Sequence, residues 1–254
     1  MDAINLKNMR KLLFLAAIAF ITFSCEESKI PGNSTLIHSN SFVGAYYTPI
    51  TLKIDKFNDY GFINISCIDS DFCSIGTSSS RHTAISEYYG DTGYDTTYNY
   101  VPHVGDPEQF LSDEIESIEI SCTSIFNEVP AGSILNEQFY LYAMTVHPYI
   151  QSNYTSKFNY ETEYAPEVFK IWKQTILEGS RNKSAYLGDP IYESLDKINY
   201  ESLKLIGGST WMKNIMFLLQ IKQIPSNPEG DLIISITFKG GKQLEARAPL
   251  SELV

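Results

Sequence analysis

Residues 232–248, with the sequence LIISITFKGGKQLEARA, decide the fold of this chain. Every second residue from Leu232 to Phe238 is apolar. The alternation resumes after Gly240-Gly241, with Leu244, Ala246 and Ala248. A period of two is typical of a strand with one buried face, and adjacent glycines accept the positive φ angles of a tight turn. The segment therefore predicts two antiparallel strands joined at the glycines.

Further strands are expected upstream of this hairpin. Apolar and polar residues alternate at residues 50–54, 63–67 and 118–122, and residues 139–146 are apolar on both faces, as in a central strand. Residues 215–221 predict another strand. The chain lacks the regular alternation of strands and helices that a parallel sheet requires. We predict a mainly β fold in the form of an antiparallel β-sandwich, for which the immunoglobulin-like type is one candidate. An α+β layer arrangement is the alternative.

Two helices are expected as an insertion near residues 164–207. Pro166 and Gly179 bound a stretch whose apolar residues fall on one helical face, and proline first and glycine last is the order that helix ends favour. The second helix is predicted from an Asp189-Pro190 cap to Gly207-Gly208, because its apolar residues are spaced four and three apart.

Residues 69–110 show neither the alternation of a strand nor the apolar spacing of a helix, and we expect a long surface excursion there. They contain the stretch EYYGDTGYDTTYNY, residues 87–100. Exposed tyrosines offer a flat apolar face and a hydroxyl group, which suit sugars and protein partners. The candidate ligand contacts are Tyr88, Tyr89, Tyr94 and Tyr98; the alternative is that these rings cover their own edge of the domain. Asp91 and Asp95 form a weak candidate pair for a cation, without the spacing of a calcium loop.

The N-terminus has the composition of a secretory signal. Three basic residues among the first eleven precede an apolar run of twelve, residues 12–23. A membrane-spanning helix needs about 20 such residues, so the run predicts a cleaved signal peptide. Ser24 suits cleavage, and Cys25 follows it. A cysteine at this boundary resembles the lipobox of bacterial lipoproteins, in which it becomes the lipidated first residue. The alternatives are an ordinary signal peptide and a buried apolar helix.

We divide the chain into a signal peptide at residues 1–24, a flexible tether at residues 25–40 and one β-rich domain at residues 41–254. Glu26 and Glu27 after Cys25 resemble the acidic patch of surface-exported lipoproteins in Bacteroidetes-type bacteria. Acyl chains such as palmitate on Cys25 would hold the domain on a membrane without a basic patch. We expect a lipid-anchored protein of the cell envelope, in the outer membrane, which the acidic pair would direct to the cell surface.

The charge of the chain argues against nucleic acid as a partner. It has 19 basic and 30 acidic residues, a net charge of −11. Without residues 1–24 there remain 16 basic and 29 acidic residues, a net charge of −13. Such a surface repels phosphate backbones. Hydrophobic residues make up 43% of the chain, which is enough for a sizeable core and excludes a wholly disordered protein.

Three cysteines remain beside Cys25, and an odd number cannot pair completely within one chain. Cys67 and Cys122 both point inward by strand parity and are the candidates for a disulfide, which an exported protein can form. Cys67 with Cys73 is the competing pair. The alternative is that all three are small buried thiols.

The sequence has no GxSxG, HExxH, P-loop or GxGxxG motif, so no catalytic residue is named. His147, after a predicted central strand, is a candidate general base, but we favour a hydrogen-bonded structural histidine. The sequence does not exclude a pair of carboxylates suited to glycoside hydrolysis, because its many acidic residues allow many pairs in space. We expect no cofactor and no metal site, since the sequence lacks a CxxC motif and its four histidines are isolated in sequence.

Loose strand and turn motifs cover most of the mature chain. They are Asp113-x-Ile115-x-Ser117-Ile118-x-Ile120, Pro130-Ala131-Gly132-Ser133-x-Leu135-Asn136-x-x-Phe139, Phe217-Leu218-Leu219, Pro225 and Ile234-x-Ile236-x-Phe238-x-x-Gly241. Together with Cys25 they resemble a lipoprotein family of Bacteroidetes-type bacteria that is known as a domain of unknown function. The resemblance implies an envelope location and a β architecture, and it carries no activity.

The sequence leaves three functions open. The leading hypothesis is a lipid-anchored binding or structural module for a glycan, a peptide or an envelope partner. An envelope glycan hydrolase with carboxylates far apart in sequence is the first alternative. A subunit of a surface filament or transport complex is the second. The absence of a catalytic signature makes us lean against an enzyme.

Overall fold

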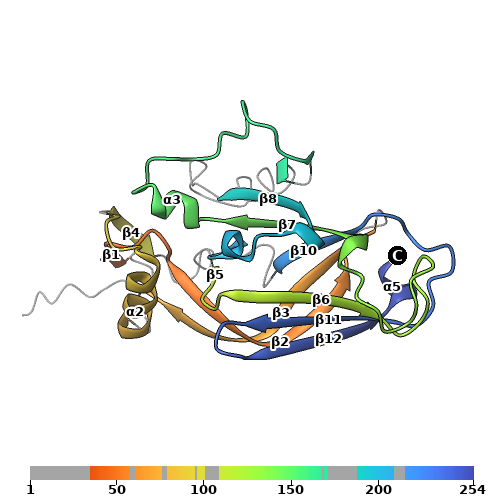
Figure 1. Ribbon diagram of the computed structural model, residues 1–254. Helices are drawn as coiled ribbons and strands as arrows, with labels where there is room; N and C mark the ends of the chain where they lie inside the picture. Colours follow the sequence, from red (N-terminus) through yellow and green to blue (C-terminus); the bar gives the residue numbers. More distant parts are fainter. Residues whose placement is uncertain are drawn as a thin grey trace, which may run out of the picture. The chain divides into compact units, whose positions relative to one another are not determined.

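The computed structural model describes most of the chain after residue 34, and residues 36–254 form one compact unit (Figure 1). The predicted signal peptide and Cys25 lie outside the described residues. The described ranges are 35–57, 61–75, 79–94, 96–100, 109–167, 169–170, 188–208 and 215–254.

The larger sheet has seven strands in the order β8-β7-β10-β3-β2-β5-β9. Neighbours pair antiparallel except β2 and β5, which are parallel. The predicted strand at residues 139–146 is β7, and it lies between two neighbours as expected of a central strand. The strands are β2 (Ala45–Lys56), β3 (Phe62–Ser74), β5 (Gln109–Leu111), β7 (Phe139–Thr145), β8 (Asp189–Ser194), β9 (Gly207–Gly208) and β10 (Ile215–Ile221).

The predicted hairpin is confirmed and forms two strands of a smaller sheet. β11 (Asp231–Phe238) pairs antiparallel with β12 (Gln243–Pro249) and with β6 (Ile115–Cys122). Gly240 and Gly241 have φ angles of 92° and 83°, as the turn requires. Every second residue of β11, from Leu232 to Phe238, is fully buried, because this face covers the larger sheet.

The two sheets share one hydrophobic core, and the fold is mainly β, as predicted. Side chains from both sheets pack together in it, and Figure 1 shows β12 running beside β2. The larger sheet contributes Leu52, Ile54, Ile63, Ile65, Leu141 and Leu219, and the smaller one Ile118, Ile120, Leu232, Ile234 and Ile236. Alternation along each strand places these residues on one face, so the sequence pattern and the core agree.

Side chains cover the free edge of β6. The Asn136 amide accepts the Ile120 N–H through Oδ1 (3.0 Å) and donates to the Ile118 carbonyl through Nδ2 (2.8 Å). The Tyr200 hydroxyl accepts the Ile118 N–H (3.1 Å). These bonds occupy backbone groups that would otherwise pair with another strand, so this edge is closed to sheet extension.

The larger sheet curls so that residues 205–208, at its β9 edge, reach β7 near its opposite edge. The Ile206 carbonyl accepts the Leu111 N–H (2.8 Å) beside β5, and Ile206 also forms a bridge with Thr145 of β7. A side chain at Gly207 would place its Cβ 2.2 Å from the Gln109 carbonyl oxygen, so only glycine fits this approach. The curl brings the residues before β9 to the end of β7.

The second predicted helix, from Asp189 to Gly207, is wrong. Asp189–Ser194 forms strand β8, and two short 3₁₀ turns follow, η2 (Leu195–Lys197) and η3 (Tyr200–Leu203). The helical spacing arises because separate elements each bury one or two apolar residues, and pairing with β7 overrides the local preference. Residues 167, 169 and 170 are helical where the first helix is predicted, and its continuation from residue 171 lies outside the described residues.

The long surface excursion predicted at residues 69–110 is also corrected. β3 continues to Ser74, and α2 (Ser79–Tyr89) follows. The buried positions of α2 are His82, Ser86 and Tyr89, on one face but largely polar. A helix that buries polar side chains has no apolar stripe, so periodicity could not reveal it. β1 (Thr35–Ser39), predicted as tether, pairs with β4 (Thr96–Tyr100).

Candidate functional site

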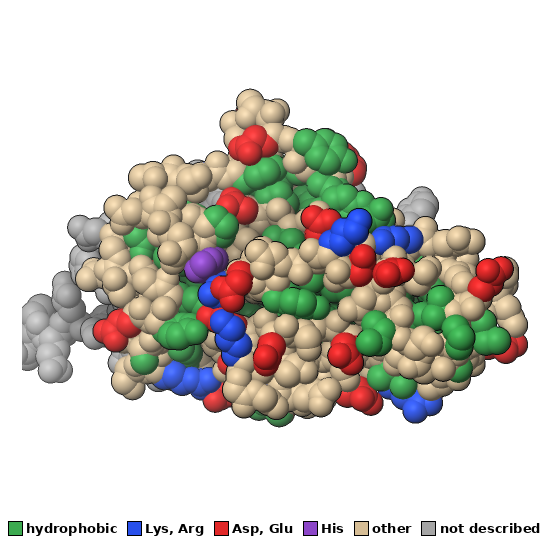
Figure 2. All heavy atoms as spheres, in the orientation of Figure 1, with side chains coloured by type: hydrophobic (Ala, Val, Ile, Leu, Met, Phe, Trp, Pro, Cys, Tyr) green, Lys and Arg blue, Asp and Glu red, His purple; other side chains and the backbone are tan. Residues whose placement is uncertain are grey.

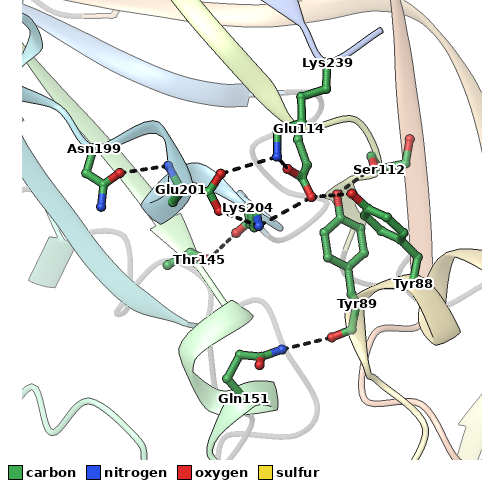
Figure 3. A network of polar contacts seen from close by, with 10 residues as sticks. All are labelled: Tyr88, Tyr89, Ser112, Glu114, Thr145, Gln151, Asn199, Glu201, Lys204 and Lys239. Carbon is green, nitrogen blue, oxygen red and sulfur yellow. Dashed lines mark hydrogen bonds and ion pairs between the residues drawn. The ribbon is translucent and has the colours of Figure 1, made fainter.

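Tyr88, at the end of α2, is an exposed aromatic side chain that is held in place. Tyr88 is 67% exposed, yet its hydroxyl donates to Glu114 Oε1 at 2.8 Å (Figure 3). Its ring meets the Tyr89 ring edge-on, with centroids 4.9 Å apart. Tyr89 is buried and donates to the Ser112 carbonyl at 2.8 Å. Tyr88 is thus fixed at its hydroxyl and against a buried ring while much of its surface faces solvent.

Glu114 is a buried carboxylate between two lysines. Lys204 Nζ lies 3.6 Å from Glu114 Oε1, and Lys239 Nζ forms an ion pair with Glu114 Oε2. Both lysines also pair with the exposed Glu201, at 2.6 Å for Lys204 and 3.3 Å for Lys239. Figure 3 shows how the residue before β6, the segment after η3 and the β11–β12 turn converge here. We call Tyr88, Glu114, Glu201, Lys204 and Lys239 the Tyr88 surface.

All four charged groups of the Tyr88 surface are stabilised in their ionised forms. Burial alone would raise the pKa of Glu114, but Lys239, Tyr88 and Lys204 outweigh it and hold that pKa below its usual value. Hydrogen bonds from Lys204 and Lys239 lower the pKa of Glu201. The pKa values of Lys204 and Lys239 are raised in turn, by Glu201 and Glu114 respectively. Two negative and two positive charges balance, so the surface attracts neither sign of ligand strongly.

His147 begins α3 (His147–Gln151) beside this network. Its ring centroid is 6.3 Å from that of Tyr89, and its backbone N–H donates to Thr145 Oγ1 at 3.1 Å. Burial, and then the charge of Lys204, lower the pKa of His147 below its usual value. The ring is therefore neutral at pH 7, at the margin of the Tyr88 surface.

The other predicted tyrosines do not join Tyr88. The Tyr94 ring lies edge-on to the Phe42 ring, with centroids 5.1 Å apart, and its centroid is 5.0 Å from that of the Tyr154 ring. Tyr98 lies in β4, and its side chain is outside the described residues. The four candidate contacts thus divide into one exposed ring, one buried ring, one ring beside Phe42 and one ring without a described position.

The Asp91 carboxylate accepts hydrogen bonds from backbone N–H groups, which occupy the oxygens that a cation would need. It is fully buried and accepts the N–H groups of Phe42 (2.7 Å) and Val43 (2.9 Å) and the Tyr154 hydroxyl (2.9 Å). These bonds attach the chain that enters the domain to the loop after α2. Asp95, its predicted partner, lies outside the described residues, and no group of three potential metal ligands occurs in the described part of the chain.

Cys67, Cys73 and Cys122 are buried free thiols, so the disulfide proposed for Cys67 and Cys122 is not formed. Cys67 and Cys122 lie in the core between the sheets, as strand parity predicts, whereas Cys73 belongs to a second cluster near α2 and α3. Burial raises the pKa of the Cys67 thiol to about 12, which makes it unreactive.

The sequence did not single out Glu114, Glu201, Lys204 or Lys239. Glu114 lies inside the motif Asp113-x-Ile115, at a position that the motif leaves open, and nothing local marks the others. They meet because the curl of the larger sheet carries Lys204 to the end of β7, where the β11–β12 turn also ends.

Comparisons with known proteins add no family. No protein-family model, no curated protein and no solved structure matches this chain. Within the described ranges, no helix has both the length and the apolar character to cross a membrane.

Proposed function

We propose that this chain is a lipid-anchored protein of the cell envelope, in the outer membrane, that acts as a binding module. The anchor is supported by the sequence alone, through the apolar run at residues 12–23 and Cys25. A lipid on Cys25 would concentrate the domain at a membrane surface without any contribution from its acidic surface. The Bacteroidetes-type lipoprotein family that the chain resembles has the same location.

The pre-ordered ring of Tyr88 is the observation that carries the binding function. Ordering a side chain at an interface costs about 0.5–1.5 kcal/mol, and that cost is largely removed when the free protein already fixes the ring. Glu114 and Tyr89 fix Tyr88 in this way, although Tyr88 is 67% exposed. Tyrosine is among the residue types that most often dominate the binding energy of an interface. We therefore assign ligand contact to Tyr88, with Lys239, Glu201 and His147 at its rim.

The ligand is a glycan, a peptide or an envelope partner. The balanced charges around Tyr88 favour a ligand that offers a face for the ring together with hydrogen-bonding groups. They do not favour a polyanion, since each lysine is already paired with a carboxylate.

The electrostatics of Glu114 and Glu201 do not support a glycan hydrolase at this position. Such an enzyme needs one carboxyl group whose pKa is raised, so that it is protonated and can donate to the leaving group. The lysines lower the pKa of both carboxylates instead.

Binding arrays test the proposal. Purified protein would be applied to glycan and peptide arrays and to immobilised envelope extract, together with the variants Tyr88→Ala and Tyr88→Phe. Removing a central ring costs about 2 kcal/mol of binding free energy, so Tyr88→Ala should weaken any specific binding about 30-fold. Tyr88→Phe keeps the ring and should lose less.

Ile125→Ala is the matched control, because Ile125 is exposed (66%) to nearly the same extent as Tyr88 but follows the end of β6 that is remote from Glu114. Equal binding by Tyr88→Ala and the unmodified protein to every ligand retained would refute the assignment to Tyr88.

A further inference from the structure

Three tyrosines form a second aromatic surface, on the outer face of the larger sheet. Tyr142 of β7 lies directly opposite Tyr192 of the edge strand β8, and Tyr140 is on the same face of β7. The ring centroid of Tyr192 is 4.5 Å from that of Tyr142 and 5.0 Å from that of Tyr140. We call these three residues the β8 tyrosine stack. It is carried by paired strands, so its shape is fixed before any ligand binds.

The stack is accessible at its β8 end. Tyr192 is 40% exposed, whereas its cross-strand partner Tyr142 is buried. Ala165 packs against the cluster around Tyr142, and the adjacent Tyr164 is 87% exposed. Figure 2 shows apolar side chains gathered over β7 and β8, with acidic and basic side chains beside them. The molecule thus presents aromatic surface at a border with charged groups.

Hydrogen-bonding side chains surround the rings. Gln220 accepts the Tyr142 hydroxyl at 2.7 Å, and Lys222 Nζ lies 4.6 Å from the centroid of the Tyr140 ring. Lys222 also donates to Ser194 Oγ and lies 4.0 Å from Asp196. The amide of Gln220 and the ammonium group of Lys222 are therefore positioned at the margin of the stack, where they can meet the hydroxyl groups of a ligand.

We propose that the β8 tyrosine stack is a binding site for a neutral glycan built of pyranose rings. One face of a pyranose carries several C–H groups and packs on an aromatic ring, while its hydroxyl groups lie at the rim and form hydrogen bonds. Tyr192 supplies the ring, and Gln220 and Lys222 supply the rim. A sugar ring would pack on the exposed surface of Tyr192, so the site needs no pocket between the tyrosines, whose rings contact one another.

Charge and backbone geometry argue against other ligands here. Lys222 is balanced by Asp196, and the chain has a net charge of −11, so an anionic glycan would be repelled. A peptide added as a strand along β8 would meet Pro190, which has no N–H, and the Ser194 N–H already bonds to Glu193 Oε1 at 3.3 Å. The edge thus offers little to an extended peptide.

This site is separate from the Tyr88 surface. It is built on β7, β8 and β10, whereas the Tyr88 surface is built on α2, the residue before β6, η3 and its following segment, and the β11–β12 turn. The inference does not rest on the proposed function, and variants of the two sites can be compared directly.

Affinity electrophoresis tests the proposal with the full mature protein. Native gels would contain glycogen, laminarin, mannan, xylan or galactan as neutral probes, and polygalacturonate as an anionic one. We expect at least one neutral polysaccharide to retard the unmodified protein. Tyr192→Ala should weaken the apparent affinity at least about tenfold. Tyr192→Phe should retain most of it, and Tyr88→Ala should retain all of it.

The remaining outcomes would overturn the proposal. Retardation by none of the neutral probes, or by polygalacturonate alone, excludes a neutral glycan. Retardation that persists in Tyr192→Ala and also in Tyr140→Ala places the ligand elsewhere. Retardation that only Tyr88→Ala abolishes assigns the glycan to the Tyr88 surface, which supports the proposed function and rejects this site. Unchanged urea unfolding of each variant shows that lost binding is not lost folding.

Discussion

Replacing Asp91 by alanine should destabilise the domain strongly. The Asp91 carboxylate accepts the N–H groups of Phe42 and Val43 at 2.7 and 2.9 Å, and Val43 is fully buried. A hydrogen bond to a charged group is worth about 1.5–3 kcal/mol, and a buried donor left without a partner costs about 1–3 kcal/mol. Discounting the Tyr154 hydroxyl, which can turn to water, we expect the free energy of unfolding to fall by about 3–5 kcal/mol.

That loss is a large share of the total stability of a domain, which is about 5–15 kcal/mol. Urea unfolding at pH 7, followed by circular dichroism, measures it through the midpoint at an unchanged slope. Asp91→Asn keeps the shape and one acceptor but turns an N–H₂ group toward a backbone N–H, so it should lose about half as much.

Asp69→Ala is the control, because Asp69 is an exposed carboxylate on β3. It should change the free energy of unfolding by less than about 0.5 kcal/mol. If Asp91→Ala were no more destabilising than Asp69→Ala, Asp91 would not be fastening the entering chain to the domain.

Three further predictions concern the anchor, the thiols and the response to pH. Cys25→Ala should move the protein from the membrane fraction to the soluble fraction; retention in the membrane would refute lipid anchoring at this residue. Alkylation of the denatured Cys25→Ala protein without reductant should modify three thiols by intact-mass analysis, whereas a single modified thiol would reveal a disulfide. The pKa of Glu114 lies below its usual value of 4.5 in the folded state, so its contribution to stability is full above pH 4.5 and is lost as the pH falls through the folded-state pKa. Glu114→Gln should remove that part of the acid-dependent loss in urea unfolding, and an unchanged pH profile would contradict the role of the lysine pairs.

Strand prediction succeeded where burial has a local signature. In β11 and β6 each inward side chain alternates with an outward one. The buried face can therefore be identified without knowing the partner strand, from Ile118, Ile120, Ile234 and Ile236. The glycines at 240 and 241 add a turn that few other residues accept.

Helix prediction failed where burial is polar or divided between elements. α2 buries His82 and Ser86, which satisfy hydrogen bonds with the Val43 carbonyl and the Tyr46 hydroxyl from a distant strand. Conversely, Ile191 and Leu195 show helical spacing although one lies in β8 and the other in a 3₁₀ turn. The spacing of apolar residues indicates which positions are buried, but it does not show whether one element or several bury them.

The amino-acid sequence by itself determined the mainly β class, the hairpin at residues 232–248 and the inward face of the core strands, because these depend on side-chain order along a short stretch. It is also the sole basis for the anchor predicted at Cys25. Only the tertiary structure decided that Tyr88 is exposed while its neighbour Tyr89 is buried, and that Glu114 meets Lys204 and Lys239. Ion pairs act over a few ångströms in space, and chain order carries no record of which distant charges the folded sheets bring within that range.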